Sequence, residues 1–325
     1  MSNLLELDNL QTTFHTRDGD VHAVRGVSFQ VQPGELVGIV GESGCGKSVT
    51  CKSIIQLLGS NGRITGGSIR FQNDDLAQKT PEQLRAIRGN DIAMIFQDPM
   101  TALNPVLTIG KQMSEILVRN KGLSKKAAKV AAIAMLEQVG IAEPERRYNQ
   151  YPHEFSGGMR QRVMIAIALS CNPKLLIADE PTTALDVTIQ AQILRLLKSL
   201  QQQTRTAILL ITHDLGVVAQ VCSRVVVMYG GLVMEEGSVE DIFYRPAHPY
   251  TQGLLASLPR PDEVNQRLSP IEGSPPGLLN PPPGCPFAER CPKRMPQCER
   301  QPAFYIAGEG HRAACWLWAD KEIQA

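Results

Sequence analysis

A glycine-rich segment, Gly41-Glu-Ser-Gly-Cys-Gly-Lys47-Ser48, has the residue types and spacing of a phosphate-binding loop, or P-loop. Its glycines allow successive backbone N–H groups to point into one concavity, and the N-terminus of a following helix adds partial positive charge. Lys47 can bridge the terminal phosphates of a nucleotide, and the Ser48 hydroxyl can ligate Mg²⁺. The predicted nucleotide-binding residues are Gly41, Ser43, Gly44, Cys45, Gly46, Lys47, Ser48 and Val49, with no separate role for the Cys45 thiol.

Two acidic residues, Asp179 and Glu180, follow the apolar run Leu175–Ala178. A buried strand that delivers a carboxylate to the C-terminal edge of a sheet is how this class of fold holds Mg²⁺ opposite a P-loop. We expect Asp179 to hold the ion, directly or through water, and Glu180 to polarise the attacking water. Taken alone, the pair would be an ordinary solvated strand end, but the P-loop favours the catalytic interpretation.

The residues around these motifs alternate between strand-like and helix-like segments. Four continuous apolar runs are typical of strands buried on both faces of a largely parallel sheet: Leu36–Val40, Leu175–Ala178, Ala207–Ile211 and Val225–Tyr229. The run 49–58 after the P-loop is predicted to be helical. Between Leu107 and Glu145 strand signals vanish, and a helix is expected to start at Ser124. Its predicted buried stripe contains Val130, Ile133, Ala134, Leu136 and Ile141.

Composition restricts the class of protein. The chain has 325 residues, 43% hydrophobic and 20% charged, which is typical of a folded chain of about two domains. The net charge of +1 argues against nucleic-acid binding through bulk charge. The longest apolar runs are far shorter than the ~18 to 20 residues of a membrane-spanning helix. The acidic N-terminus differs from a targeting segment, so we expect a cytoplasmic location.

A third motif, Tyr151-Pro-His-Glu-Phe-Ser-Gly-Gly-Met-Arg-Gln161, resembles the signature of the ATP-binding-cassette (ABC) ATPases. Ile95-Phe-Gln97-Asp-Pro resembles the Q-loop of that family, Thr183-Ala-Leu-Asp186 its D-loop, and Ile211-Thr-His213-Asp214 its switch histidine. The match covers roughly residues 4–245. It implies an α/β fold with a P-loop ABC ATPase core, a mostly parallel sheet, an antiparallel β subdomain and an inserted helical subdomain. We expect a nucleotide-binding domain over 1–245, its helical subdomain at about 98–170, and an extension over 246–325.

The resemblance also implies roles for individual residues. ATP bound to one P-loop would be closed over by Ser156, Gly157 and Gly158 of another subunit. Met159 stands where most of the family has Gln, but the hydroxyl and unobstructed N–H groups that an anion needs remain. Further implied positions are Gln97 as Mg²⁺ ligand and γ-phosphate sensor, His213 on the γ-phosphate, Asp186 in the D-loop and Phe14 on the adenine. A core aromatic is the alternative for Phe14, and the adenine contact is favoured over it.

Three stretches resemble the ATPase subunits of dipeptide and oligopeptide importers, a group that includes nickel importers. They are 98–105, 245–251 and the segment Pro270–Pro286, in which seven residues are proline. The proline segment is expected to be extended and stiff. The implied partners are two membrane-spanning permease subunits, a second homologous ATPase and an extracytoplasmic solute-binding protein. The protein would lie on the cytoplasmic face of the inner membrane.

Two other functions remain open. A soluble ABC ATPase of translation or DNA repair would usually carry two cassettes or a long coiled-coil insertion, and neither occurs in this sequence. A nucleic-acid-binding regulator with a zinc tail would be expected to carry more positive charge. The sequence does not identify the transported solute.

Four of the eight cysteines lie near the C-terminus: Cys285, Cys291, Cys298 and Cys315. Their number and thiolate chemistry suit a four-cysteine iron–sulfur cluster or tetrahedral zinc, and the spacing alone does not decide. Some peptide-importer ATPases that this chain resembles carry a [4Fe–4S] cluster in such a tail, which favours the cluster over zinc or free thiols. Its expected role is to staple a segment too short to bury a core.

Overall fold

The computed structural model describes residues 3–98, 102–183, 185–258 and 270–319. The chain divides into two compact units. Unit 1 comprises residues 1–30, 37–77 and 212–325, and unit 2 comprises residues 31–36 and 78–211. The described residues beyond position 245 thus share a compact unit with the P-loop. The expected division at residue 245 stays a prediction.

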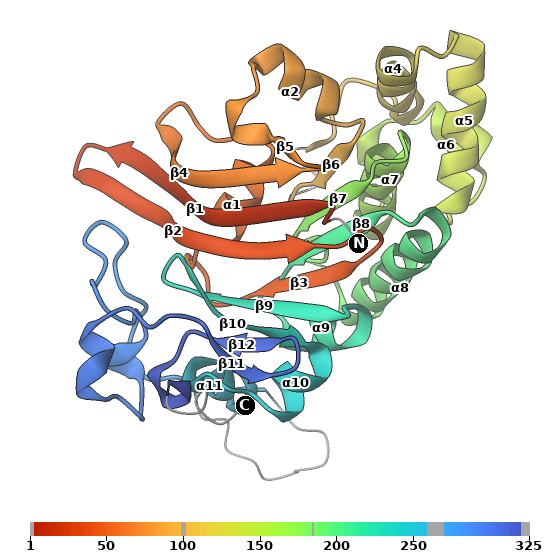
Figure 1. Cartoon of the computed structure of the whole chain (residues 1–325). Coiled ribbons are helices and arrows are strands. Elements are labelled where there is room, and N and C mark those ends of the chain that lie inside the picture. The colour runs from red at the N-terminus through yellow and green to blue at the C-terminus, as the bar shows by residue number, and fades with distance from the viewer. Residues whose placement is uncertain (1–2, 99–101, 184, 259–269, 320–325) are drawn as a thin grey trace. The chain divides into compact units, whose positions relative to one another are not determined.

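An antiparallel sheet forms part of unit 1, with strand order β2-β1-β4-β5 (Figure 1). Its strands are β1 (Leu5–Thr16), β2 (Gly19–Val31), β4 (Gly62–Phe71) and β5 (Asp74–Asp75). β1 is antiparallel to β4, with Leu5 opposite Phe71 and Phe14 opposite Gly62. Alternation along β1 buries Leu5 and Leu7, as a strand with one covered face requires. The antiparallel β subdomain is confirmed.

A mixed sheet in unit 1 follows the order β11-β12-β10-β9-β3. Its strands are β3 (Leu36–Val40), β9 (Arg224–Tyr229), β10 (Leu232–Ser238), β11 (Tyr305–Gly308) and β12 (His311–Ala313). β3 and β9 are parallel, whereas β9, β10, β12 and β11 pair antiparallel. The C-terminal residues therefore add two strands to the sheet that were not expected from the sequence.

Short helices complete the described part of unit 1. They are α1 (Lys47–Ile54), α9 (Leu215–Val221), α10 (Val239–Tyr244), α11 (Pro249–Ala256) and the 3₁₀ turns η1 (Leu76–Gln78, which reaches one residue into unit 2), η3 (Ala288–Arg290), η4 (Pro296–Glu299) and η5 (Trp316–Trp318). The predicted helix 49–58 is shorter than expected, because the chain turns at Gln56, which has φ +48°. The proline segment 270–286 contains neither helix nor strand, as predicted.

Unit 2 holds a parallel sheet of order β8-β7-β6, with β6 (Ile92–Ile95), β7 (Leu175–Asp179) and β8 (Ala207–Ile211). Its helices are α2 (Pro81–Ile87), α4 (Ile109–Lys121), α5 (Lys125–Gln138), α6 (Pro144–Tyr148), α7 (Gly157–Leu169) and α8 (Val187–Thr204), with the 3₁₀ turn η2 (Pro152–Glu154). β7 and β8 are buried along their whole length, which explains their continuous apolar sequences.

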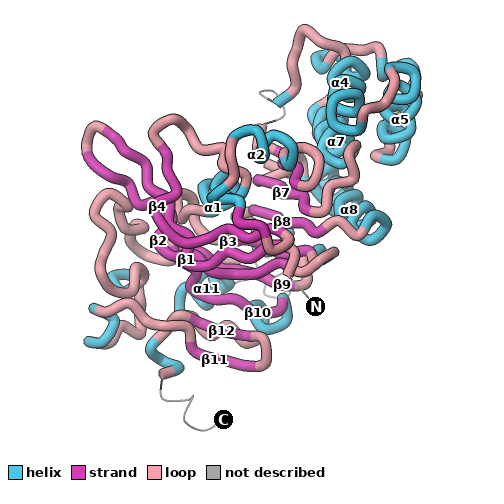
Figure 2. The backbone as a smooth tube through the Cα atoms, turned by 45° about the horizontal axis from the view of Figure 1, so that its top comes forward, coloured by secondary structure: helices cyan, strands magenta, loops and turns pink. Residues whose placement is uncertain are grey.

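Helices α4, α5 and α7 pack together within unit 2 (Figure 2). Ser124 caps α5 as predicted, its side chain accepting a hydrogen bond from Ala127 N–H. The predicted stripe on α5 is wrong in part: Val130 is 64% exposed and Ala134 is also exposed. The buried face is Ala128, Ala132 and Leu136, so the prediction is confirmed for Leu136 and also for Ile141, which follows the helix. Residues four positions apart share one face of a helix, whereas Val130 is two positions from both Ala128 and Ala132 and therefore lies on the opposite side, toward solvent.

None of the helices in the described part of the chain combines the length and hydrophobicity needed to cross a membrane.

Candidate functional site

The P-loop of unit 1 joins β3 to α1 and depends on glycine at two positions. Gly41 has φ +149°, and a Cβ there would lie 2.1 Å from the Met228 carbonyl oxygen. Gly46 has φ +102°, and a Cβ there would lie 2.5 Å from the Ala23 carbonyl oxygen. Both backbone conformations disfavour other residues. The loop is therefore held tightly against β9 and β2 on one side.

The opposite side of the loop is open. A Cβ built on Gly44 would meet no atom within 4 Å, and Ser43 and Gly44 are exposed. Lys47 is 5% exposed, and its Nζ donates to the carbonyl oxygens of Gly41 (2.7 Å) and Glu42 (2.9 Å). A loop with an open glycine, a lysine bonded to its first two carbonyl oxygens and a helix starting at its end fits the phosphates of a nucleotide.

The remaining P-loop residues differ in exposure. Ser48 and Val49 are half-buried in the first turn of α1, and Cys45 is buried. Burial raises the pKa of the Cys45 thiol, although Lys47 opposes this. The thiol therefore stays neutral near pH 7, which agrees with assigning it no chemical role.

Two more predicted residues lie in unit 1. His213 is exposed and comes just before α9, which Asp214 caps by accepting hydrogen bonds from Gly216 N–H (2.8 Å) and Val217 N–H (3.3 Å). Phe14 is half-buried, and its ring would lie 2.6 Å from a Cβ on Gly62. This packing agrees with either a core aromatic or a ring with one free face, so the adenine contact stays a prediction.

In unit 2, the structure brings Glu180 and Gln97 together. The Glu180 Oε2 atom accepts hydrogen bonds from Gln97 Nε2 (2.8 Å) and from Thr183 Oγ1 (2.9 Å). Glu180 also has φ +47°, a left-handed conformation that costs a non-glycine residue about 1–2 kcal/mol. Strain of this kind persists where surrounding contacts hold a residue in place, and it is common at active sites. The carboxylate of Glu180 is thus held in a defined position.

Asp179 is the last residue of β7 and is 4% exposed. The predicted Mg²⁺ ligands, Ser48, Gln97 and Asp179, offer a hydroxyl, an amide oxygen and a carboxylate. These oxygen donors are those that Mg²⁺ prefers. The donor chemistry therefore fits the ion.

The signature residues form the N-terminus of α7. Ser156 caps the helix by accepting a hydrogen bond from Met159 N–H (3.4 Å). Ser156 and Gly157 are exposed. Position 158 requires glycine, because a Cβ there would lie 2.7 Å from Ile189 Cγ2. Asp186 caps α8 by accepting from Ile189 N–H (2.9 Å). The helix N-terminus is accordingly open for an anion.

The four C-terminal cysteines lie in unit 1. Burial raises the pKa of Cys285 to about 12, with neighbouring cysteine charges adding to the effect, and also raises that of Cys291 and Cys315. Cys285 N–H donates to the Cys298 carbonyl oxygen (3.0 Å). Across the described ranges, however, no three His, Cys, Asp or Glu side chains are placed to hold a metal ion. The side-chain geometry therefore gives no support to the predicted metal centre.

Sequence reasoning missed three residues at these sites. Thr183 was noted only as part of the D-loop, although a hydroxyl three residues after Glu180 could have signalled the contact. Tyr250, which lies in the importer-like stretch 245–251, and Arg290, which lies among the C-terminal cysteines, both contact Glu42 of the P-loop, and no local pattern predicts these contacts. Of the importer-like stretch 98–105, residues 99–101 lie outside the described part of the chain, as does Ala184 of the D-loop.

Two family models match the chain. The model described as "ABC transporter" matches residues 24–183. The model described as "Oligopeptide/dipeptide transporter, C-terminal region" matches residues 234–298. The second match falls on the segment that follows the cassette motifs and includes Arg290 and three of the four C-terminal cysteines.

Similar proteins extend over nearly the whole chain. The dipeptide transport ATP-binding protein DppD of Bacillus subtilis is 57% identical over 319 residues, covering 98% of this chain and 95% of that protein. The oligopeptide transport ATP-binding protein OppD of Salmonella typhimurium is 51% identical over 313 residues, covering 96% and 93%. Among solved structures, the ADP- and phosphate-bound dimer of the ATP-binding cassette MJ0796 aligns with a TM-score of 0.65 and 30% identity, over 72% of this chain and 98% of that chain.

Proposed function

The chain belongs to the ATP-binding subunits of oligopeptide and dipeptide ABC transporters, and from that premise we propose that it hydrolyses ATP to drive import of di- or oligopeptides through separate permease subunits. The observation that carries the proposal is the match of residues 234–298 to the C-terminal region of oligopeptide and dipeptide transporters. A cassette shared by all ABC ATPases would leave the solute class open.

The P-loop residues would bind the nucleotide and Lys47 would bridge its terminal phosphates. Mg²⁺, held by Ser48, Gln97 and Asp179, would neutralise charge on those phosphates. Glu180 would orient and polarise the attacking water, since its carboxylate is fixed by Gln97 and Thr183. His213 would hold the γ-phosphate. Phe14 would stack on the adenine.

A second subunit would complete each nucleotide site. Ser156 to Gly158 are at the N-terminus of α7, and their exposure is consistent with docking on the ATP of a partner cassette. Asp186 would act at the same interface. We expect the partner to be a homologous ATPase rather than a second copy, together with two permeases and an extracytoplasmic binding protein. The protein would then be peripheral on the cytoplasmic face of the inner membrane.

Peptide uptake in a strain that lacks this subunit tests the solute class. Wild-type chain should restore uptake of a labelled di- or oligopeptide, and Glu180→Gln should not. Co-purification of Glu180→Gln with ATP from detergent-solubilised membranes should recover two permeases and a second ATPase. Restored nickel uptake without peptide uptake would support the alternative small-solute importer. Recovery with ribosomes or DNA alone would overturn the transport assignment.

We also propose that the C-terminal cysteines bind a [4Fe–4S] cluster once it is assembled on them, with zinc as the less favoured alternative. The support is chemical: four thiols in one short segment, with Arg290, Lys293 and Arg294 nearby to balance a negatively charged cluster. Iron analysis of anaerobically purified protein tests this. Cys291→Ser should lose iron, whereas Cys222→Ser, which changes an equally half-buried cysteine, should keep it. Iron that is absent from wild type, or unchanged in Cys291→Ser, would exclude the cluster.

A further inference from the structure

Glu42, the second residue of the P-loop, is held from the C-terminal part of unit 1 by two hydrogen bonds. Its backbone N–H donates to Tyr250 Oη at 2.9 Å. Its carboxylate accepts a hydrogen bond from Arg290 Nη1 at 2.7 Å. The Glu42 side chain is 25% exposed and the Arg290 side chain is 7% exposed. One contact fixes the backbone of Glu42 and the other fixes its side chain. The fold thus connects the nucleotide loop to α11 and η3.

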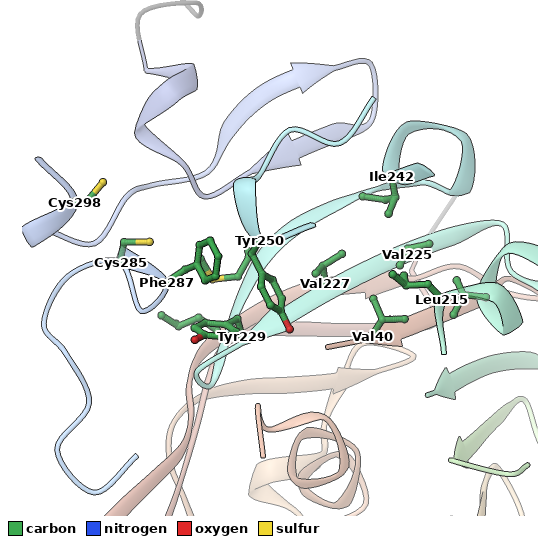
Figure 3. Packing of buried hydrophobic residues seen from close by; sticks show 13 residues of the cluster. Val40, Leu215, Val225, Val227, Tyr229, Ile242, Tyr250, Cys285, Phe287 and Cys298 are labelled. Carbon is green, nitrogen blue, oxygen red and sulfur yellow. The ribbon is translucent and has the colours of Figure 1, made fainter. Parts of the chain in front are cut away.

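Tyr250 is rigidly placed. It is fully buried in an aromatic cluster with Tyr229 and Phe287, whose ring centroids lie 4.5 Å and 5.3 Å from its own (Figure 3). Burial raises the pKa of the Tyr250 hydroxyl far above its usual value, so it remains a neutral acceptor for Glu42 N–H. Tilted aromatic rings at these distances attract one another beyond simple burial. The hydroxyl therefore cannot follow the loop if the loop moves.

Arg290 is equally constrained. Besides Glu42, its guanidinium donates to Tyr229 Oη (3.0 Å), to the Ile271 carbonyl oxygen (2.9 Å) and to the Glu272 carbonyl oxygen (2.8 Å). The planar fork of arginine fixes these contacts relative to one another. Because the charge is largely removed from water, the bond to Glu42 is stronger than a surface ion pair. Arg290 is a fixed anchor supplied by the cysteine-rich segment.

On its other side, Glu42 contacts the lysine that faces the phosphates. The Glu42 carbonyl oxygen accepts a hydrogen bond from Lys47 Nζ at 2.9 Å, next to the one from Gly41. Gly41 and Gly46 pack closely against β9 and β2, whereas the exposed Gly44 between them leaves the middle of the loop less restrained. A shift of Glu42 would therefore move an acceptor that sets the position of Lys47.

We propose that Arg290 and Tyr250 are positioning residues for ATP binding, which hold Glu42 so that the P-loop is preorganised before the nucleotide arrives. The inference rests on the assignment of Gly41 to Ser48 as the nucleotide site. Preorganisation raises affinity because the loop is ordered before binding. The C-terminal segment that carries Arg290 and Tyr250 thereby contributes to the nucleotide affinity of the cassette.

Calorimetric titration of the full chain with MgADP tests the inference without hydrolysis. Tyr250→Phe keeps the buried ring and removes only the hydroxyl, so the nucleotide-free protein should stay folded while Kd rises about fivefold. Tyr244→Phe, at an 81% exposed tyrosine, is the matched control and should bind as wild type. Unchanged affinity in a folded Tyr250→Phe protein would overturn the role of Tyr250.

A double-mutant cycle separates positioning by Arg290 from general stability. Arg290→Met and Glu42→Gln should each weaken MgADP binding about tenfold, and the double variant should be no weaker than either one. Arg290→Lys should recover part of the loss. Additive effects, or a lower melting temperature with unchanged Kd, would refute the role of Arg290.

A wrong assignment of the nucleotide site can be distinguished from a wrong positioning role for Tyr250 and Arg290. Lys47→Ala should lose most MgADP affinity. If Lys47→Ala binds as wild type, the nucleotide site itself is misplaced and the inference falls with it. If Lys47→Ala loses binding but Tyr250→Phe and Arg290→Met do not, only the positioning role is wrong.

Discussion

Lowering the pH from 7 to 5 should destabilise unit 1 by charging a histidine that the fold keeps neutral. His248 caps α11, its Nδ1 accepting a hydrogen bond from Tyr250 N–H at 3.0 Å, which only an unprotonated nitrogen can do. Its backbone N–H donates to Glu235 Oε2 (2.9 Å), and His311 Nε2 lies 2.7 Å from Glu235 Oε1. His248 is 1% exposed, and burial lowers its pKa to about 4, against a smaller opposing effect of Glu235.

The size of the effect follows from that shift. The pKa of His248 is lower in the folded protein than in the unfolded chain, so protons bind the unfolded chain more tightly. Its contribution to stability is therefore complete above about pH 6.5 and is lost as the pH falls toward about 4. A shift of this size corresponds to about 3 kcal/mol at ~1.36 kcal/mol per unit. At pH 5, where unfolded histidine is mostly charged and folded His248 mostly neutral, about 2 kcal/mol is lost.

Tryptophan fluorescence gives a local readout of this region. The chain has two tryptophans, Trp316 and Trp318, and Trp318 Nε1 donates to the carbonyl oxygen of Ala247 at 3.0 Å. Urea unfolding should show that, from pH 7 to pH 5, the free energy of unfolding falls by about 2 kcal/mol more in wild type than in His248→Asn. Asn can cap the helix but does not titrate.

Groups that do not contact His248 are common to wild type and variant and cancel in the comparison. His153→Asn, at an exposed histidine, should keep the pH dependence of wild type. An identical loss in wild type and His248→Asn would refute the reasoning.

Three further outcomes are expected. Glu180→Gln should lower ATP hydrolysis by about 10²- to 10⁴-fold while keeping ATP binding and trapping a dimer with the partner ATPase on gel filtration; hydrolysis at the wild-type rate would remove Glu180 from its role. Gly46→Ala should lower the melting temperature and abolish nucleotide binding, because its Cβ would lie 2.5 Å from the Ala23 carbonyl oxygen, whereas Gly277→Ala meets no atom within 4 Å and should melt as wild type. Ala132→Leu, on the buried face of α5, should lower the free energy of unfolding by about 1–3 kcal/mol through overpacking, as measured by chemical denaturation. The exposed Val130→Leu should be neutral within about 0.5 kcal/mol, and equal effects would contradict the observed face.

The parallel core could be predicted from the sequence because burial on both faces leaves a continuous apolar run. The expected strands 36–40 and 207–211 agree with β3 and β8. Ser124 was recognised as a helix start because capping depends on local chemistry. Patterns of this kind require only neighbouring residues, which is why they can be read from one chain.

Features that depend on distant partners were missed. The buried face of α5 is built on Ala128 and Ala132, and hydrophobicity alone ranks alanine below the exposed Val130. β11 and β12 are short and partly polar, and they form because β10 offers an edge to pair with. Neither case carries a signal within its own segment.

The residues of the proposed nucleotide site show the same difference between local motifs and distant partners. The P-loop and the carboxylate of Glu180 follow from local motifs, but the contacts that hold Glu42 come from residues 208 and 248 positions further along the chain. Because His248 caps the helix that carries Tyr250, the packing of this C-terminal segment and the geometry of the loop are linked through one short helix. A sequence motif can therefore predict where phosphate binds, whereas the proposed affinity of that site also depends on residues that only the folded chain brings to it.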